Sequence, residues 1–224
     1  MLPSLTDRAV LVERMDAPDC CEKRLLCTIR QFALLNRIVS RYGTILQRWV
    51  LDDMLLNPSR TYHLLDMGAG GCDIDVWLLR EAQRLGLRLR VTACDSDPRI
   101  LGYARRMHRE TSGLFFSSQD VLRDDSEMPV DYVFANHFLH HLSNEHIIEL
   151  LTRWAPRVRR RMVFSDLRRS RSAYVGHAML SAFFPGGFIR EDGLTSIRRS
   201  FHADELATLA QRAGLARHAS VHAF

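Results

Sequence analysis

The middle of the chain alternates short apolar runs with segments whose apolar residues recur at helical spacing. Apolar runs that end at polar residues predict buried strands at residues 62–66, 90–94, 115–122, 130–136 and 161–166. Helical spacing between them predicts crossover helices at residues 74–85, 99–109 and 146–155, with Asp97 and Ser143 as N-caps. Strands that alternate with helices form parallel sheets with right-handed crossovers, so we predict an α/β, doubly wound, mostly parallel sheet.

The first 58 residues have a helical pattern instead. Apolar residues from Leu25 to Val39 predict one amphipathic helix, interrupted by Asn36 and ended by Tyr42 and Gly43. Thr44 is the predicted cap of a second helix, which runs to residue 54 before the break at residues 57–59. We interpret residues 1–58 as a helical cap over a ligand site.

After residue 167 the alternation stops. A predicted helix at residues 172–184 ends at Pro185 and two glycines, and we interpret residues 168–201 as an inserted helical lid. Open α/β sheets bind ligands beyond the carboxyl ends of their strands, and such a lid would cover that edge. We then predict a helix at residues 202–213 and a sixth strand at residues 216–224. No residues remain for a seventh strand.

A glycine-dense turn follows the first predicted strand, which ends in Asp66. Gly68 and Gly70 allow a sharp turn and close approach of a ligand, and the next helix points free N–H groups at it. A dinucleotide is one interpretation, but the third glycine of its fingerprint is replaced by Asp73. Asp66 and Asp73 would repel a pyrophosphate and attract an ammonium group, which favours a zwitterionic adenosyl cofactor.

The second predicted strand also ends in an acid, Asp95. In doubly wound folds a carboxylate at this position accepts hydrogen bonds from ribose hydroxyls. The alternative is that this segment is only a capped turn and contacts no ligand; it comprises Asp95, Ser96, Asp97 and Pro98.

In this order the motifs resemble those of the class I S-adenosylmethionine-dependent methyltransferases, closely over residues 62–167. The resemblance implies a Rossmann-like cofactor domain at residues 59–224 and a small-molecule, natural-product type of enzyme in secondary metabolism. The implied reaction is O-methylation of a phenolic, quinone-like or polyketide-type acceptor. It also implies cofactor contacts from the turn and from later strand ends: Asp66, Gly68, Ala69, Gly70, Asp95, Ser96, Asp120, Val121 and Asn136.

Three histidines, His137, His140 and His141, follow the fourth predicted strand. Methyl transfer to a hydroxyl gains from a base with a pKa near the working pH, so we expect one of them, with His140 favoured, to be the base or to orient the acceptor. Capping or packing is the alternative. On a helix His137 and His141 would share a face and could chelate zinc, but the sequence offers no obvious carboxylate companion, so we expect no metal site.

Composition limits which classes of protein the chain can belong to. The chain is 46% hydrophobic and 25% charged, and no apolar run approaches the roughly 20 residues of a membrane span. The first residues lack the pattern of a signal peptide and the five cysteines lack C-x-x-C spacing, so we expect a cytoplasmic protein with reduced thiols.

The formal charge of +5 raises the question of nucleic acid as a partner. Its arginine clusters, at residues 157–161 and 168–171, lack the interleaved aromatic residues that stack on bases, so we expect a small-molecule acceptor. An RNA-modifying methyltransferase and a non-catalytic, cofactor-binding partner subunit remain the alternatives. A homodimer is left open.

Overall fold

The computed structural model describes residues 3–123 and 129–222, and it divides into two compact units. The sheet unit comprises Phe32–Asn136 and Arg153–Ser165, and the helical unit comprises Met1–Gln31, His137–Thr152 and Asp166–Phe224. The sequence predicted a boundary near residue 58 instead. The helices at residues 42–54 belong with the sheet because their apolar side chains enter its core.

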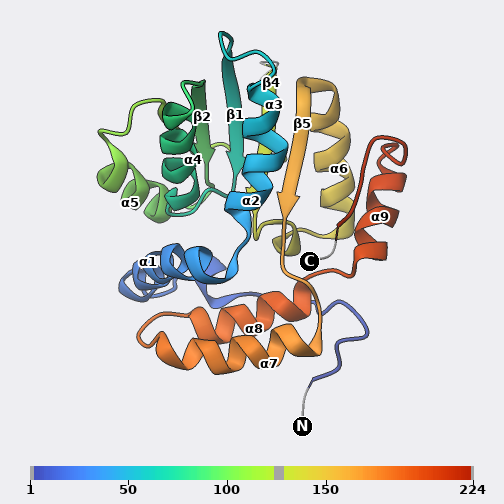
Figure 1. The fold of residues 1–224 in the computed structure, drawn as a ribbon. Helices are drawn as coiled ribbons and strands as arrows, with labels where there is room; N and C mark the ends of the chain where they lie inside the picture. Colours follow the sequence, from blue (N-terminus) through green and yellow to red (C-terminus); the bar gives the residue numbers. More distant parts are fainter. Residues whose placement is uncertain (1–2, 124–128, 223–224) are drawn as a thin grey trace. The chain divides into compact units, whose positions relative to one another are not determined.

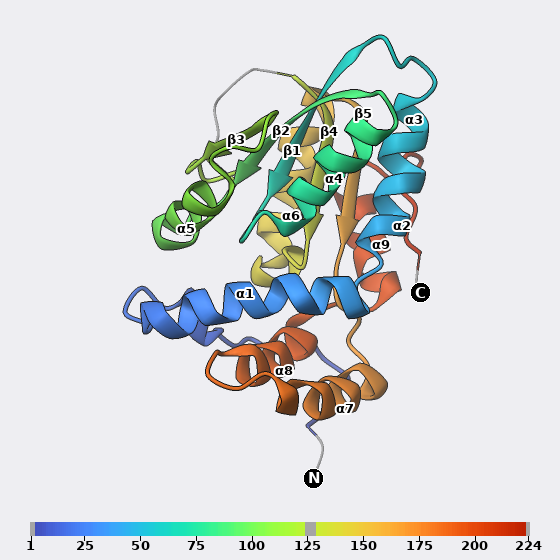
Figure 2. The same ribbon diagram turned by 60° about the vertical axis from the view of Figure 1, so that its left-hand side comes forward.

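The sheet unit is built on five parallel strands, as the alternation predicted (Figure 1 and Figure 2). Their order is β3-β2-β1-β4-β5. Asp66 pairs with Ala93 and with Phe134, and Asn136 pairs with Ser165, so the carboxyl ends of the central strands lie along one edge. The strands are β1 (Thr61–Met67), β2 (Arg88–Cys94), β3 (Leu114–Ser117), β4 (Val130–Asn136) and β5 (Val158–Ser165).

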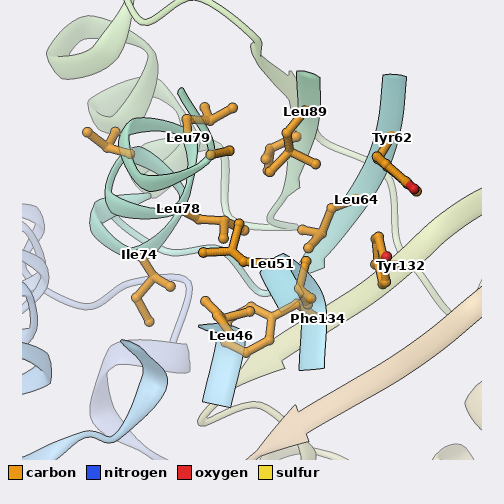
Figure 3. Close-up of a cluster of buried hydrophobic side chains, with 14 of the residues drawn as sticks. Leu46, Leu51, Tyr62, Leu64, Ile74, Leu78, Leu79, Leu89, Tyr132 and Phe134 are labelled. Atoms are coloured by element: carbon orange, nitrogen blue, oxygen red, sulfur yellow. The ribbon is translucent and has the colours of Figure 1, made fainter. Parts of the chain in front are cut away.

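One face of this sheet carries the apolar core of the unit. Side chains at alternate positions of the strands, such as Leu64, Leu89 and Phe134, pack against Leu46, Leu51 and the first crossover helix (Figure 3). Full burial of one such side chain contributes roughly 1.5–3 kcal/mol. The covering helices are α2 (Tyr42–Leu46), the π-helical turn η2 (Gln47–Leu51), α3 (Asp52–Met54) and α4 (Asp73–Arg84), and Figure 2 shows α4 in front of the strands.

The N-terminal helix prediction was wrong in its details. Helix α1 (Glu22–Val39) ends before Tyr42, and Tyr42 and Gly43 begin α2, so Thr44 lies inside a helix and caps nothing. Tyr42 meets Trp77 edge to face at 5.2 Å, and a Cβ added at Gly43 would lie 3.4 Å from the same indole ring. Gly43 therefore allows close packing on Trp77 and does not end a helix.

Two predicted helix starts are confirmed. Helix α5 (Pro98–His108) is capped by Asp97, whose Oδ1 accepts the backbone N–H of Arg99 at 2.8 Å. In α6 (Asn144–Trp154) the backbone N–H of His146 donates to the hydroxyl of Ser143 at 3.1 Å. Both caps satisfy N–H groups that the first helical turn leaves without partners.

The helical unit contains the predicted helices at residues 172–184 and 202–213, and a further helix between them. Helices α7 and α8 lie side by side (Figure 1). The predicted sixth strand is not found at residues 216–222, which are exposed and form neither helix nor strand, and residues 223–224 of that prediction lie outside the described residues. The elements are η1 (Arg14–Asp16), η3 (Leu139–His141), α7 (Arg171–Leu180), η5 (Ser181–Phe183), α8 (Ile189–Arg199) and α9 (Ala203–Arg212).

Among the described residues, no helix is both long enough and apolar enough to span a membrane.

The contact between α7 and α8 yields a stability prediction. A Cβ at Gly193 in α8 would overlap the ring of His177. Nε2 of that ring is hydrogen-bonded to the carbonyl oxygen of Ile189, at 2.9 Å. Gly193→Ala should therefore destabilise the protein by about 1–3 kcal/mol in chemical denaturation. Gly176 lies inside α7 and a Cβ there would meet nothing within 4 Å, so Gly176→Ala is the matched control. It should be neutral or stabilise by about 0.5–1 kcal/mol, and equal losses in both variants would contradict the described packing.

Candidate functional site

The glycine turn after β1 is pinned to the end of β2. The backbone N–H groups of Gly68 and Ala69 both donate to the carbonyl of Cys94, at 2.8 and 3.0 Å. Gly68, Gly70 and Cys72 have φ values of 72°, 55° and 59°, in the left-handed region that glycine adopts without strain. A Cβ added at Gly70 would meet no atom within 4 Å, so the turn borders open space.

Asp95 joins this turn to the beginning of α5. Its Oδ2 accepts the backbone N–H of Gly70 at 3.0 Å, and its Oδ1 accepts that of Asp97 at 2.9 Å. Ser96, between the two acids, is exposed. The structure thus brings together the glycine turn and the second strand-end acid, as the sequence predicted.

Asp66 does not face solvent but pairs with a second buried acid, Asp75 of α4. Their residues are 4% and 1% exposed, and no donor from a described residue reaches Oδ1 of Asp66 or either carboxyl oxygen of Asp75. Burial raises the pKa of Asp75 to about 7, and burial together with the charge of Asp75 raises the pKa of Asp66 well above its usual range. The two acids therefore share a proton near neutral pH.

Sequence reasoning missed Asp75, although a signal was present. Asp75 lies on the same helical face as Leu78, Leu79 and Ala82, so it interrupts an apolar stripe. Asp73, which precedes it, is held by the amide of Asn36 at 3.2 Å, and burial raises the pKa of Asp73. Four acids, Asp66, Asp73, Asp75 and Asp95, therefore surround the turn, an environment that opposes a pyrophosphate.

The remaining predicted cofactor residues follow β3 and β4. Asp120 is exposed and caps its own turn, accepting the N–H of Leu122 at 3.0 Å. Val121 is buried, and its carbonyl accepts the indole N–H of Trp154 at 3.0 Å. Asn136 ends β4, and its buried Oδ1 has no hydrogen-bond partner in the described part of the chain.

His137 is not helical, contrary to the expectation that His137 and His141 share a helical face. Its φ of 54° turns the chain between the end of β4 and the short helix η3, which holds only His140 and His141 of the three. Burial lowers the pKa of His137 to about 4, so its ring is neutral at neutral pH. Its Nδ1 lacks a hydrogen-bond partner among the described residues.

His140 has the opposite environment. It is 2% exposed, its Nδ1 lies 2.6 Å from Oδ1 of Asp166, and its Nε2 lies 3.5 Å from Oε1 of Glu13. Burial alone would lower the pKa of His140, but Asp166 and Glu13 raise it to about 9. Burial would likewise raise the pKa of Asp166, yet His140 holds it at about 2. The favoured candidate base is therefore protonated at neutral pH.

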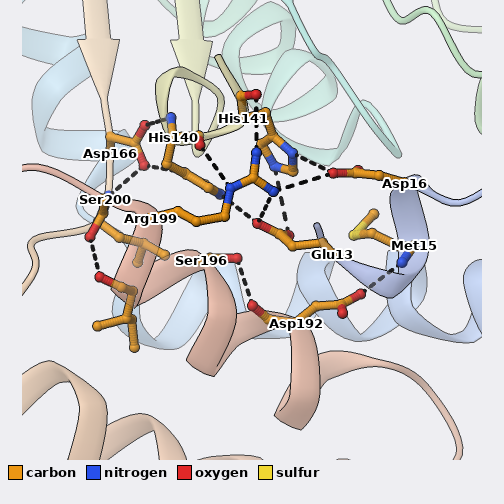
Figure 4. A network of polar contacts seen from close by, with 12 residues as sticks. Glu13, Met15, Asp16, His140, His141, Asp166, Asp192, Ser196, Arg199 and Ser200 are labelled. Atoms are coloured by element: carbon orange, nitrogen blue, oxygen red, sulfur yellow. Dashed lines mark hydrogen bonds and ion pairs between the residues drawn. The ribbon is translucent and has the colours of Figure 1, made fainter. Parts of the chain in front are cut away.

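The same network includes His141 and Arg199 (Figure 4). Nδ1 of His141 lies 3.0 Å from Oδ2 of Asp16, and its Nε2 lies 3.8 Å from Oε2 of Glu13. Arg199 reaches Oε1 of Glu13 at 3.3 Å and donates to the carbonyls of His140 and His141 at 3.1 and 3.0 Å. Sequence reasoning missed Glu13 and Asp16, because they precede the histidines by more than 120 residues and no local pattern marks them.

Comparison with known proteins was informative only at the level of structure. No protein-family model and no curated protein sequence matches the chain. The plantazolicin methyltransferase BpumL, solved with a triazolic desmethylPZN analog and SAH, has a TM-score of 0.64 and 15% identity, covering 92% of this chain and 73% of that one. Magnesium protoporphyrin IX methyltransferase ChlM from Synechocystis PCC 6803, with bound SAH, has a TM-score of 0.53 and 15% identity, covering 90% and 80%. The chain has the class I methyltransferase fold.

A third solved structure agrees, that of the S-adenosylmethionine-dependent methyltransferase SibL in its apo form. It has a TM-score of 0.56 and 20% identity over 89% of this chain, which spans about half of SibL (53%). The resemblance found in the sequence is therefore confirmed for the fold. In this methyltransferase fold the glycine turn and Asp95 follow strands of the central sheet, and Asn136 is the last residue of one.

The buried acid pair yields a prediction for stability against pH. The native state keeps a proton on Asp75 up to about pH 7, whereas the unfolded chain releases it near 3.8, so stability falls as pH rises through this window. Asp75→Asn removes this loss and should raise the free energy of unfolding at about pH 8 relative to about pH 5, by at most roughly 3 kcal/mol.

Urea denaturation of wild type and variant at both pH values measures the effect. The matched control is Asp52→Asn, at an exposed acid of the same unit that accepts only a surface hydrogen bond from Gln47. We expect the control to follow wild type at both pH values. A pH-independent difference between Asp75→Asn and wild type would argue against a shared proton.

Proposed function

We propose that the protein is an S-adenosylmethionine-dependent methyltransferase that transfers the methyl group to the oxygen of a small phenolic, quinone-like or polyketide-type acceptor. The observation that carries this proposal is the glycine turn with open space at Gly70, held by the carboxylate of Asp95. The same fold in BpumL and ChlM, both solved with SAH, supports it.

The residues present fit this cofactor. The space at Gly70 and the unsatisfied Oδ1 of Asn136 are features that a bound polar ligand would fill, and Asp95 lies between the turn and α5, where it could accept ribose hydroxyls. When bound, S-adenosylmethionine supplies an electrophilic methyl group on a sulfonium. Asp66, predicted as a cofactor contact, is instead buried against Asp75, so the residues that would hold the cofactor are Gly68, Ala69, Gly70, Asp95, Ser96, Asp120, Val121 and Asn136.

Within this proposal His137 orients the acceptor hydroxyl by accepting its hydrogen bond at Nδ1, since a pKa of about 4 is too low for a base that works near neutral pH. It follows Asn136 directly, its ring is neutral at neutral pH, and its Nδ1 makes no hydrogen bond to another described residue. His140 is less suited to that role, because carboxylates face both of its ring nitrogens. We therefore transfer the preference from His140 to His137, and treat His140 and His141 as residues that position the segment after β4.

The RNA-modifying alternative was motivated by the arginine clusters, and several of those arginines are engaged within the protein. Arg160 and Arg161 both form ion pairs with Asp53. Arg169 is fully buried, donating to the carbonyl of Ser200 at 2.5 Å and pairing with Glu205 at 2.6 Å. These contacts favour a structural role for the clusters. The cytoplasmic location, the homodimer and the roles of cap and lid stay predictions.

Cofactor binding tests the proposal first. Isothermal calorimetry should show saturable binding of S-adenosylmethionine and S-adenosylhomocysteine to the wild type. Asp95→Ala should weaken it by about tenfold to a hundredfold, since a hydrogen bond to a charged group contributes roughly 1.5–3 kcal/mol. Asp52→Ala is the surface control and should bind as wild type does. A wild type that binds neither ligand would overturn the proposal.

The role of His137 requires a turnover assay. Labelled methyl transfer to cell extract and to a panel of phenols and hydroxyquinones identifies an acceptor, and with it His137→Asn should lower kcat about 10²-fold through misplacement of the acceptor, while cofactor affinity stays within about twofold. His146→Asn, at an exposed histidine of α6, is the matched control. Full activity in His137→Asn would contradict this assignment. No turnover by the chain alone, restored by a co-purifying protein, would favour the partner-subunit alternative.

A further inference from the structure

Two imidazoles and a carboxylate converge in the helical unit, as Figure 4 shows. Nε2 of His140 lies 3.5 Å from one oxygen of Glu13, and Nε2 of His141 lies 3.8 Å from the other. Within the described ranges, these three residues are a group whose candidate ligand atoms all lie within 4.8 Å of one another. We propose that Glu13, His140 and His141 bind a divalent transition-metal ion, with zinc as the best match.

The spacing of the donors fits the geometry of such an ion. Zinc binds histidine nitrogen and carboxylate oxygen at about 2.0–2.2 Å, so neighbouring donors of a tetrahedral site lie about 3.3–3.5 Å apart. The two nitrogens approach different oxygens of Glu13, at 3.5 and 3.8 Å. One donor atom from each of the three residues lies within 4.8 Å of the others, so modest side-chain rotations would bring the donors to this spacing around an ion. Three protein donors leave a fourth position for water or another ligand.

The orientation of both rings is fixed from behind by carboxylates. Nδ1 of His140 lies 2.6 Å from Asp166, and Nδ1 of His141 lies 3.0 Å from Asp16. A carboxylate that accepts the Nδ1–H of a histidine leaves Nε2 as the ligand atom, which is the arrangement around metal-binding histidines, and the Nε2 proton of His140 would be released to solvent as the ion binds. Both rings therefore direct Nε2 toward Glu13, although their centroids are only 4.4 Å apart.

The charge of the cluster also suits a divalent cation. Glu13, Asp16 and Asp166 contribute three negative charges, and Arg199 pairs with Glu13 and Asp16 at 3.3 and 3.6 Å. A divalent ion bound by neutral imidazoles would bring the sum of these groups to zero. Because Glu13 is only 2% exposed, such compensation has a large electrostatic effect.

The donor set indicates which metals would bind. Two imidazole nitrogens and one carboxylate favour zinc, cobalt, nickel or ferrous iron over magnesium and calcium, which prefer oxygen ligands alone. We expected no metal site from the sequence because no carboxylate companion was evident near the histidines. Glu13, from the segment before α1, supplies that companion in the folded chain.

Metal titration of the full chain, stripped with a chelator, tests the site. Zinc added in competition with a chromophoric chelator should bind at one equivalent, and Glu13→Gln and His141→Asn should each weaken binding at least about a hundredfold. Glu145→Gln and His146→Asn, at exposed neighbours on α6, are the matched controls and should bind as wild type does. Zinc should raise Tm in wild type and controls only.

Cobalt provides a spectroscopic readout that separates this site from the cysteines. Cobalt bound by histidine and carboxylate gives visible d–d bands without the near-ultraviolet charge transfer of a thiolate ligand. Should Glu13→Gln fail to fold by circular dichroism, Asp16→Asn is the second variant, since loss of such an outer contact weakens binding about tenfold to a hundredfold. Substoichiometric zinc in wild type, binding that survives the folded variants unchanged, or a thiolate band would each overturn the proposal. None of these outcomes depends on methyl transfer.

Discussion

The parallel pairing of β1 with both β2 and β4 is the constraint on which the candidate cofactor site depends. It sets Asp66 level with Ala93 on one side and Phe134 on the other, so the chain leaves all three strands at the same edge. The hydrogen bonds from Gly68 and Ala69 to Cys94, and from Gly70 to Asp95, follow from that alignment. A slip of one residue would turn Asp66 and its neighbours to the opposite face and separate the turn from Asp95.

Alternation within β1 also explains why Asp66 is buried. Tyr62, Leu64 and Asp66 share the face that carries the core, so the carboxyl group of Asp66 is directed toward α4 and meets Asp75 there. The cost of burying two acids is reduced because they keep a proton between them. In the helical unit the buried carboxylates are stabilised by positive charge instead. Glu13 and Asp166 form ion pairs with His140, and Glu13 also pairs with Arg199.

Local pattern was sufficient to predict the sheet, most crossover helices, two N-caps and the glycine turn, because each depends on residues close together in the chain. Prediction failed where distant residues decide the outcome. We predicted that Gly43 ends a helix, because its packing on Trp77 cannot be seen in the sequence. We placed His137 on a helix, because a single residue with a left-handed backbone conformation leaves no periodic signal in the sequence. The network around His140 depends on Glu13, more than 120 residues away.

The contrast between His137 and His140 shows how much the surroundings decide the chemistry of one side-chain type. Three residues apart, one ring is half-buried with an unsatisfied nitrogen and a lowered pKa, and the other lies between carboxylates with a raised pKa. A neutral imidazole can accept a hydrogen bond from an acceptor hydroxyl, whereas a ring between two carboxylates holds a cation, either a proton or a metal ion. The division of roles argued for these histidines therefore follows from whether a carboxylate reaches the ring.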